Sequence, residues 1–219
     1  MAGAEPGRWD DEAKVAWYLD RVYREGRREF LRAGDELLVD LLPPAPEAAL
    51  DLGCGDGRLA DLIMVARPSL RRMVALDVSP PMLARARERF ADDPRVEVVE
   101  HDLAEPLEDL GRFDAVVAGF AIHHVTDERK QALYGEVARL LRPGGVFVNL
   151  EVVQSATPEL HAQFLAAVDR DHDDLEDKLA PVEPQLAWLR AARLEQVDCL
   201  WRWRGVALPT GVAPGIHDL

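Results

Sequence analysis

Apolar positions near the N-terminus recur at helical spacing. Val15, Leu19 and Val22 lie at i, i+4 and i+7, and a second apolar stripe of leucines ends at Leu42. Prolines within residues 43–46 then end the helix, because proline cannot continue one. The pattern predicts a helical N-terminal extension over residues 1–46. This extension could close over a ligand as a lid or fill the flank of a sheet.

After the prolines, short apolar runs alternate with amphipathic stretches. The runs that predict strands are Ala48–Leu52, Met73–Val78, Val96–Val99, Phe113–Ala118 and Val146–Val152. Helices are expected between them at Arg58–Ala66, Pro81–Phe90 and Glu128–Leu141. Hydroxyls before or near helix starts, at Ser79, Thr126 and Thr157, predict N-caps. Strands that alternate with helices imply right-handed βαβ units and a mostly parallel sheet covered on both faces.

The last third of the chain has a different pattern. It predicts helices over Ala156–Asp177 and Gln185–Arg193, followed by two strands or a hairpin within Glu195–Leu208. We therefore expect one doubly wound α/β domain over residues 47–219, preceded by the helical extension.

Composition narrows the class of protein. The chain has 219 residues, no apolar run near the length of a membrane span, and no start typical of a secretory signal. Its two cysteines, Cys54 and Cys199, are too few for a disulfide framework and are expected to be small packed residues in a cytoplasmic protein. The net charge of −14 has the wrong sign for binding nucleic acid or an anionic membrane.

A glycine-rich turn follows the first predicted strand, in the run Asp51-Leu-Gly-Cys-Gly-Asp-Gly57. Glycine at positions 53 and 55 lets the backbone turn sharply and lets a ligand approach closely. Asp77 ends the second predicted strand, where a carboxylate can accept hydrogen bonds from both hydroxyls of a ribose. Both features predict an adenosine-containing ligand across the first two strands.

The spacing of the glycines distinguishes between ligands. Nicotinamide and flavin sites use G-x-G-x-x-G, whereas this chain has G-x-G-x-G. A pyrophosphate favours bare amides and a helix N-terminus. Asp51 and Asp56 would repel a pyrophosphate, but they suit a ligand that carries an ammonium and a sulfonium.

These motifs resemble those of class I S-adenosylmethionine-dependent methyltransferases, over roughly residues 48–151. The resemblance implies a Rossmann-like, mostly parallel seven-stranded sheet with helices on both faces and an antiparallel last strand. It also implies S-adenosyl-L-methionine as cofactor and the following binding residues: Asp51, Gly53, Cys54, Gly55, Asp77, Val78, Met82, Asp102, Leu103, Gly119 and Phe120. The chain departs from the family before the sixth strand, where Ala192-Arg193-Leu194 stands in place of a frequent glycine.

Two adjacent histidines, His123 and His124, follow the fourth predicted strand. An imidazole there could take a proton from the acceptor, because its ordinary pKa lies near neutrality. In an extended segment only one of them would face the pocket, and His124 is slightly preferred. We expect no metal site, because the pair lacks a Cys, Asp or Glu at ligand spacing.

Two further features have a structural interpretation. The acidic run from Asp169 to Asp177 lacks the Gly and Glu that an EF-hand loop needs, and it predicts a solvated acidic helix end. Trp188, Trp201 and Trp203 could line an apolar substrate pocket, although core packing is the favoured interpretation.

The sequence thus predicts methyl transfer to an oxygen, nitrogen or carbon of a small molecule. Alternatives are a protein that binds the cofactor without transfer, one that modifies the cofactor, an NAD(P)-dependent oxidoreductase, and an RNA methyltransferase. Glycine spacing disfavours the oxidoreductase, and the negative charge disfavours RNA.

Overall fold

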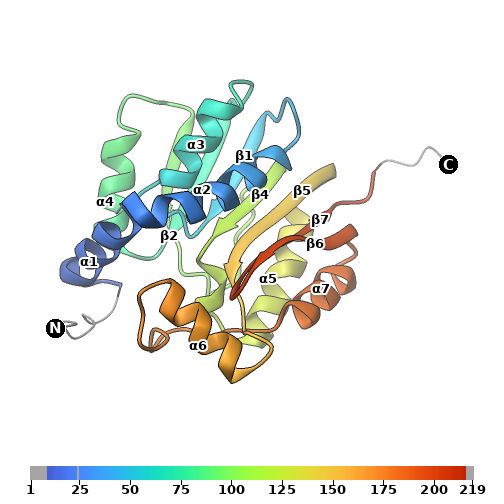
Figure 1. Ribbon diagram of the computed structural model, residues 1–219. Coiled ribbons are helices and arrows are strands. Elements are labelled where there is room, and N and C mark those ends of the chain that lie inside the picture. The colour runs from blue at the N-terminus through green and yellow to red at the C-terminus, as the bar shows by residue number, and fades with distance from the viewer. Residues whose placement is uncertain (1–8, 24, 216–219) are drawn as a thin grey trace.

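Seven strands form one sheet in the order β3-β2-β1-β4-β5-β7-β6, with helices on both faces (Figure 1). The computed structural model describes residues 9–23 and 25–215, without the side chains of residues 25–31. The strands are β1 Ala48–Leu52, β2 Arg72–Asp77, β3 Val96–Glu100, β4 Phe113–Gly119, β5 Leu141–Val152, β6 Glu195–Trp203 and β7 Val206–Val212. The α-helices are α1 Glu12–Tyr23, α2 Glu25–Asp40, α3 Arg58–Ala66, α4 Pro80–Arg89, α5 Asp127–Leu140, α6 Pro158–Ala167 and α7 Val182–Ala191.

The direction of the strands confirms the predicted doubly wound sheet. Strands β1 to β5 pair in parallel, and β7 runs antiparallel to both β5 and β6. The strand order reverses between β1 and β4, so the carboxyl ends of these strands border the crevice where open α/β sheets bind ligands.

Two apolar layers hold the helices against the sheet. On one face α5 and α7 contribute side chains such as Leu133 and Leu189 to a buried cluster with Leu50 of β1. On the other face α2 and α3 contribute Leu38 and Ile63 to a second cluster. The expected hydroxyl caps are confirmed, since the side chains of residues 79, 126 and 157 each accept a backbone N–H of their helix.

The N-terminal extension contains two helices, α1 and α2. One matches the expectation of a filled sheet flank and the other the expectation of a lid. Helix α2 fills the flank of the sheet, where a Cβ at Gly34 would lie 2.9 Å from the side chain of Leu150 in β5. Helix α1 lies instead beside the carboxyl ends of the strands, over the cavities described below.

The helix predicted over Ala156–Asp177 is wrong in length, because α6 ends at Ala167. Asp169 has a positive φ of 53°. Beyond it, the carboxylate of Asp177 accepts the Asp174 amide, and that of Asp174 accepts the Glu176 amide. Such local bonds from aspartate compete with helical bonds. Residues 168–181 therefore form a folded loop.

The turn before β6 accommodates the departure from the family pattern. Arg193 takes a φ of 67°, the left-handed conformation that favours glycine. Its neighbour Leu194 donates its amide to the carbonyl of Leu189, which closes α7. The turn therefore forms with arginine, at some conformational cost.

In the part of the chain that the structure describes, no helix is both long and apolar enough to span a membrane.

Candidate functional site

A cavity of about 320 Å³ lies at the carboxyl ends of β1, β2 and β4. All eleven residues predicted to bind a cofactor line this first cavity: Asp51, Gly53, Cys54, Gly55, Asp77, Val78, Met82, Asp102, Leu103, Gly119 and Phe120. Lining residues that the sequence reasoning did not assign include Trp9, Tyr18, Arg58 and His101. The predicted set is therefore brought together at one place.

The glycine turn allows a close approach of backbone to cavity. Gly53 has a φ of 71°, and a Cβ there would lie 2.2 Å from the Cβ of Ala121. Gly55 has a φ of 56° and donates its amide to Asp77 at 2.8 Å. A side chain at position 53 would both strain the backbone and clash, so the turn requires glycine there.

Asp77 is fixed by backbone donors. One carboxylate oxygen accepts the Gly55 amide, and the other accepts the Ser79 amide at 2.8 Å. Burial raises the pKa of Asp77 despite these amides, which act in the opposite direction. The carboxylate is thus oriented before any ligand arrives, and each oxygen keeps capacity for a further hydrogen bond.

Asp51 lies at the end of β1 with no exposed surface. Neither of its carboxylate oxygens has a hydrogen-bond partner among the described residues. Burial raises the pKa of Asp51 to about 7, while the positive charge of Arg58 and the nearby backbone amide of Ala60 oppose the rise. A buried carboxylate without a partner is costly, so this position suits a cationic group that enters the cavity.

Asp56 differs from the expectation that it would face the ligand as a bare charge. Its carboxylate accepts a hydrogen bond from Tyr23 at 2.6 Å and forms an ion pair with Arg89 at 2.7 Å. Arg58 is paired in turn with Asp35 of α2. The charge of Asp56 is therefore largely satisfied within the protein, and Asp51 is the carboxylate left for a cation.

The N-terminal segment is tied to the rim of the first cavity. The Ser79 hydroxyl, which caps α4, donates to the backbone carbonyl of Trp9 at 2.5 Å. The Trp9 ring packs edge-on against Tyr18, with centroids 5.1 Å apart. Glu12 forms an ion pair with Arg85 of α4. Helix α1 therefore covers one side of the cavity, as a lid would.

A second cavity, of about 380 Å³, adjoins the first. Five residues line both cavities: Trp9, Tyr18, Val22, Phe120 and His124. Its apolar walls include Trp17, Phe164 and Trp203, and its polar lining includes His123, Arg170 and three aspartates of the 168–181 loop. A ligand in either cavity would therefore face a ligand in the other across this shared wall.

The histidine pair lies in a 3₁₀ turn, Ile122–His124, and not in an extended segment. The two rings pack together with centroids 4.0 Å apart. Both histidines line the second cavity, and His124 lines the first as well. The expectation that only one would face a pocket was wrong, because residues in a tight turn do not alternate as in a strand.

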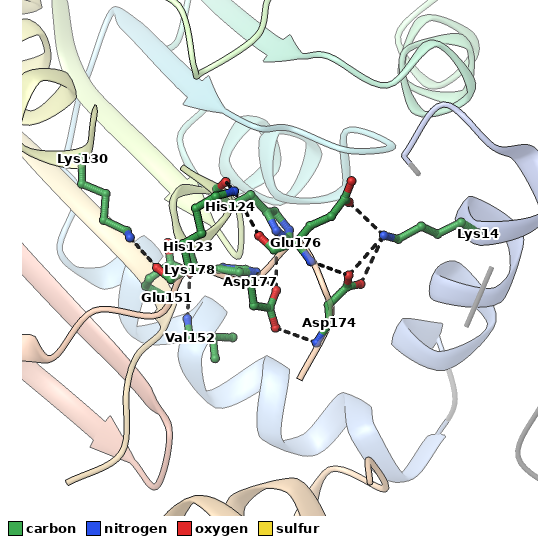
Figure 2. Close-up of polar contacts among 10 residues, drawn as sticks. All are labelled: Lys14, His123, His124, Lys130, Glu151, Val152, Asp174, Glu176, Asp177 and Lys178. Atoms are coloured by element: carbon green, nitrogen blue, oxygen red, sulfur yellow. Dashed lines mark hydrogen bonds and ion pairs between the residues drawn. The ribbon is translucent and has the colours of Figure 1, made fainter. Parts of the chain in front are cut away.

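Two acidic side chains from distant segments contact this pair (Figure 2). His123 Nδ1 lies 2.5 Å from Glu151 Oε1 at the end of β5. Asp177 Oδ1 lies 3.5 Å from His123 Nε2 and 3.6 Å from His124 Nδ1. The expectation that the pair lacks an acidic partner was wrong, because the fold supplies partners that sequence spacing does not show.

The two histidines have opposite electrostatic settings. Burial lowers the pKa of His123, but Glu151 and Asp177 outweigh burial and raise it. Burial, together with the neighbouring His123, holds the pKa of His124 well below its usual value. His124 is therefore the neutral ring of the two near pH 7.

The acidic run does not lie at the end of a long helix, and it is solvated only in part, since Asp169 and Asp171 are exposed. The Asp174 and Asp177 side chains are only 9% and 6% exposed. Lys14 of α1, almost fully buried, pairs with Asp174 at 3.2 Å and with Glu176 at 2.9 Å. Helix α1 and the 168–181 loop are thereby joined over the second cavity.

The tryptophans divide between core packing, which was the favoured interpretation, and the lining of a cavity. Trp188 packs against the cluster under α5 and α7, and Trp201 packs against the cluster on the other face. Trp203 also packs against that second cluster and lines the second cavity. Cys54 is buried, and burial strongly raises the pKa of its thiol, as expected for a packed residue.

Known methyltransferases are similar to parts of this chain. Residues 49–145 match the family described as "Methyltransferase domain". An uncharacterized methyltransferase of Mycobacterium tuberculosis is 36% identical over 126 residues, which cover 58% of this chain and 59% of the relative. The malonyl-[acyl-carrier protein] O-methyltransferase of Salmonella typhimurium is 32% identical over 173 residues, which cover 77% and 64%. The chain thus spans about three fifths of the length of these curated relatives.

Solved structures show the same fold. An O-methyltransferase family protein from Burkholderia thailandensis has a TM-score of 0.74 at 20% identity, covering 96% of this chain and 63% of that one. The family match, the seven-stranded sheet and the glycine turn with its two carboxylates agree with one another. Residues 49–145 are therefore similar to methyltransferase domains, and the fold matches that of the solved O-methyltransferase family protein.

Proposed function

We propose that the chain binds S-adenosylmethionine in the first cavity and transfers its methyl group to a small molecule in the second cavity. The observation that carries this proposal is Asp51, a buried carboxylate without a hydrogen-bond partner in the described structure, beside a backbone-oriented Asp77. An amino acid ammonium would satisfy Asp51, and a ribose diol would satisfy Asp77. The residues present therefore fit the cofactor.

The protein's contribution would be binding and orientation. When bound, S-adenosylmethionine supplies a methyl group already activated by a sulfonium. Asp51 would bind the ammonium group of the cofactor and Asp77 its ribose hydroxyls. Neither carboxylate would take part in forming or breaking a bond. The shared wall of the two cavities, with Phe120 and His124, would set the acceptor opposite the donor, which is the main source of rate in such a reaction.

The lining of the second cavity favours an acceptor with an apolar body and one polar nucleophile. Trp17, Phe164 and Trp203 offer aromatic surface, while the histidine pair and Asp177 lie together at one side. An oxygen, nitrogen or carbon nucleophile would be directed toward this polar side. A neutral His124 can take a proton from an acceptor that is protonated at neutral pH.

Calorimetry with S-adenosylmethionine tests the cofactor site. We expect Asp77→Ala to weaken binding about 100-fold, because two hydrogen bonds to a charged acceptor are lost. Asp109→Ala is the matched control, since the Asp109 side chain is 87% exposed. Equal affinity of wild type and Asp77→Ala would refute the site.

Methyl transfer is tested separately, with a radiolabelled donor and a panel of apolar phenols, amines and carboxylic acids. Label in any acceptor supports transfer. Tight cofactor binding with no labelled product across the panel would favour a protein that binds the cofactor without transferring the methyl group.

A further inference from the structure

We infer that His123, His124 and Asp177 form a binding site for a divalent transition-metal ion at the polar side of the second cavity. The three side chains come from the 3₁₀ turn after β4 and from the 168–181 loop. One ligand atom from each lies within 4.8 Å of the others. This inference reverses the expectation from sequence, which considered only residues near the pair along the chain.

The spacing of the donor atoms fits a metal better than it fits a hydrogen-bonded triad. At metal–ligand distances of 2.0–2.2 Å, two ligands of a tetrahedral ion lie about 3.4 Å apart. Asp177 Oδ1 lies 3.5 Å and 3.6 Å from the two imidazole nitrogens. In the described part of the chain, His124 Nδ1 has no hydrogen-bond partner. Two of the three spacings thus match a tetrahedral site, and the two imidazole nitrogens lie within 4.8 Å of each other.

Two of the three ligands, His123 and Asp177, are oriented by a contact on the side away from the proposed ion. Glu151 Oε1 contacts His123 Nδ1 at 2.5 Å, which leaves the lone pair on Nε2, the atom nearest Asp177. Histidine ligands of metals are commonly oriented by a carboxylate in this way. Asp177 uses Oδ2 to accept the Asp174 amide at 3.1 Å, so Oδ1 is left toward the histidines.

The loop that carries Asp177 is fastened to the histidine turn (Figure 2). The Lys178 amide donates to the His123 carbonyl at 2.7 Å, and Lys178 Nζ donates to the His124 carbonyl at 2.7 Å. Lys130 donates to the Lys178 carbonyl. The third ligand is therefore held in place although it is distant in sequence.

Burial and charge also suit a divalent cation. The side chains of His123 and Asp177 are 7% and 6% exposed, while His124 is 24% exposed and borders both cavities. Two acidic groups, Asp177 and Glu151, accompany the two imidazoles. Imidazole and carboxylate ligands suit Zn²⁺ and Co²⁺ better than Mg²⁺ or Ca²⁺, which favour oxygen ligands alone.

An ion held by three protein ligands keeps an open position, as in catalytic zinc sites. Here that position would face the second cavity. Given the methyl transfer proposed above, an acceptor hydroxyl or carboxylate would fit it, and coordination would lower the pKa of a hydroxyl. With an ion bound, His124 would be a ligand, and the proton transfer proposed for it above would apply only to the metal-free site.

Cobalt spectroscopy on the full chain, freed of metal with a chelator, tests the inference without any activity assay. Wild type is expected to bind one Co²⁺ with the intense visible absorption of a four-coordinate site, and Zn²⁺ should abolish that absorption. Asp177→Asn can keep the hydrogen bond from Asp174, and it should weaken Co²⁺ binding about tenfold to 100-fold. Glu151→Gln, a change at a positioning residue, should weaken binding less and shift the cobalt spectrum.

His172→Ala is the matched control, because His172 is exposed and lies in the same loop. Absence of a 1:1 Co²⁺ complex in wild type, or unchanged affinity in Asp177→Asn, would overturn the inference. Circular dichroism of each variant verifies the fold, and His123→Gln provides a second test if Asp177→Asn fails to fold. Calorimetry with S-adenosylmethionine on the same samples separates the claims, since lost metal binding with intact cofactor binding refutes only the metal site.

Discussion

The two cavities are built in different ways. Most of the first cavity comes from strand ends and turns between Asp51 and Val125, whereas the second collects α1, the histidine turn, α6 with its loop, and the β6–β7 hairpin. Backbone geometry shapes the first, and side chains from distant segments shape the second. A local motif can therefore predict the first cavity, while the second depends on how the whole chain folds.

This difference explains which features a sequence can indicate. The eleven positions expected to bind a cofactor all line one cavity, because a glycine turn and strand-end carboxylates act through local backbone geometry. The strand pattern also predicted the sheet, since buried parallel strands read as continuous apolar runs.

The sequence predictions failed where contacts between distant segments determine the local structure. The acids of the 168–181 loop look like a solvated helix end until Lys14 and the histidines are seen beside them. The contact between His123 and Glu151 joins residues on different elements, which no spacing rule connects. The best available signal was the number of acids at the end of the predicted helix, from Asp169 to Asp177.

The largest expected effect is at the glycine turn. Gly53→Ala should lower the free energy of unfolding by about 3 kcal/mol and abolish cofactor binding, because it combines a positive φ with a close contact at Ala121. Chemical denaturation and calorimetry measure the two effects. Gly135→Ala is the control, since a Cβ there meets only Arg139 at 4.0 Å and helix α5 favours alanine. A stable, cofactor-binding Gly53→Ala protein would contradict a backbone-built first cavity.

The next largest effect is a pH dependence of cofactor affinity, which arises from Asp51 in the first cavity. The pKa of Asp51 is about 7, above its ordinary value near 4. Burial favours the protonated form of Asp51 in the folded protein without ligand. The free energy of unfolding should therefore fall as the pH rises from about 4, the ordinary pKa, to about 7. A cationic ligand needs the ionised form, so cofactor affinity should fall as the pH drops below 7.

Calorimetry between pH 7.5 and 6 measures this dependence, in a range where an α-amino group stays mostly protonated. We expect cofactor affinity to fall about tenfold per pH unit below the pKa of Asp51, after the pH dependence due to other groups has been subtracted. Asp51→Asn should bind weakly and with a flatter profile, and it should be more stable than wild type at pH 7.5. A wild-type affinity that does not change with pH would contradict the role of Asp51.

A smaller effect should distinguish the acceptor-binding role of the second cavity from the cofactor-binding role of the first. Trp17 lines only the second of them. Trp17→Ala is expected to raise the KM of the acceptor about fivefold through lost aromatic contact, with the Kd of the cofactor unchanged. If the cofactor affinity changed instead, the assignment of the two cavities would need to be exchanged or merged.

The smallest effect concerns the turn before β6. Arg193→Gly removes the cost of a positive φ and should stabilise the protein by about 0.5–1 kcal/mol, with both cavities unaffected. Arg190→Gly, in the last turn of α7, is the control and should destabilise the protein, because glycine is a poor helix former and the hydrogen bond from Arg190 to the Val197 carbonyl is lost. A destabilised Arg193→Gly protein would mean that the arginine side chain makes a larger contribution than the backbone cost.

A crystal structure with S-adenosylhomocysteine, the product that remains after methyl transfer, tests the central claim most directly. The account predicts the amino group of this compound within hydrogen-bond distance of Asp51, both ribose hydroxyls on Asp77, and the sulfur directed toward the second cavity. Density for the compound elsewhere, or in the first cavity with Asp51 still without a partner, would contradict it.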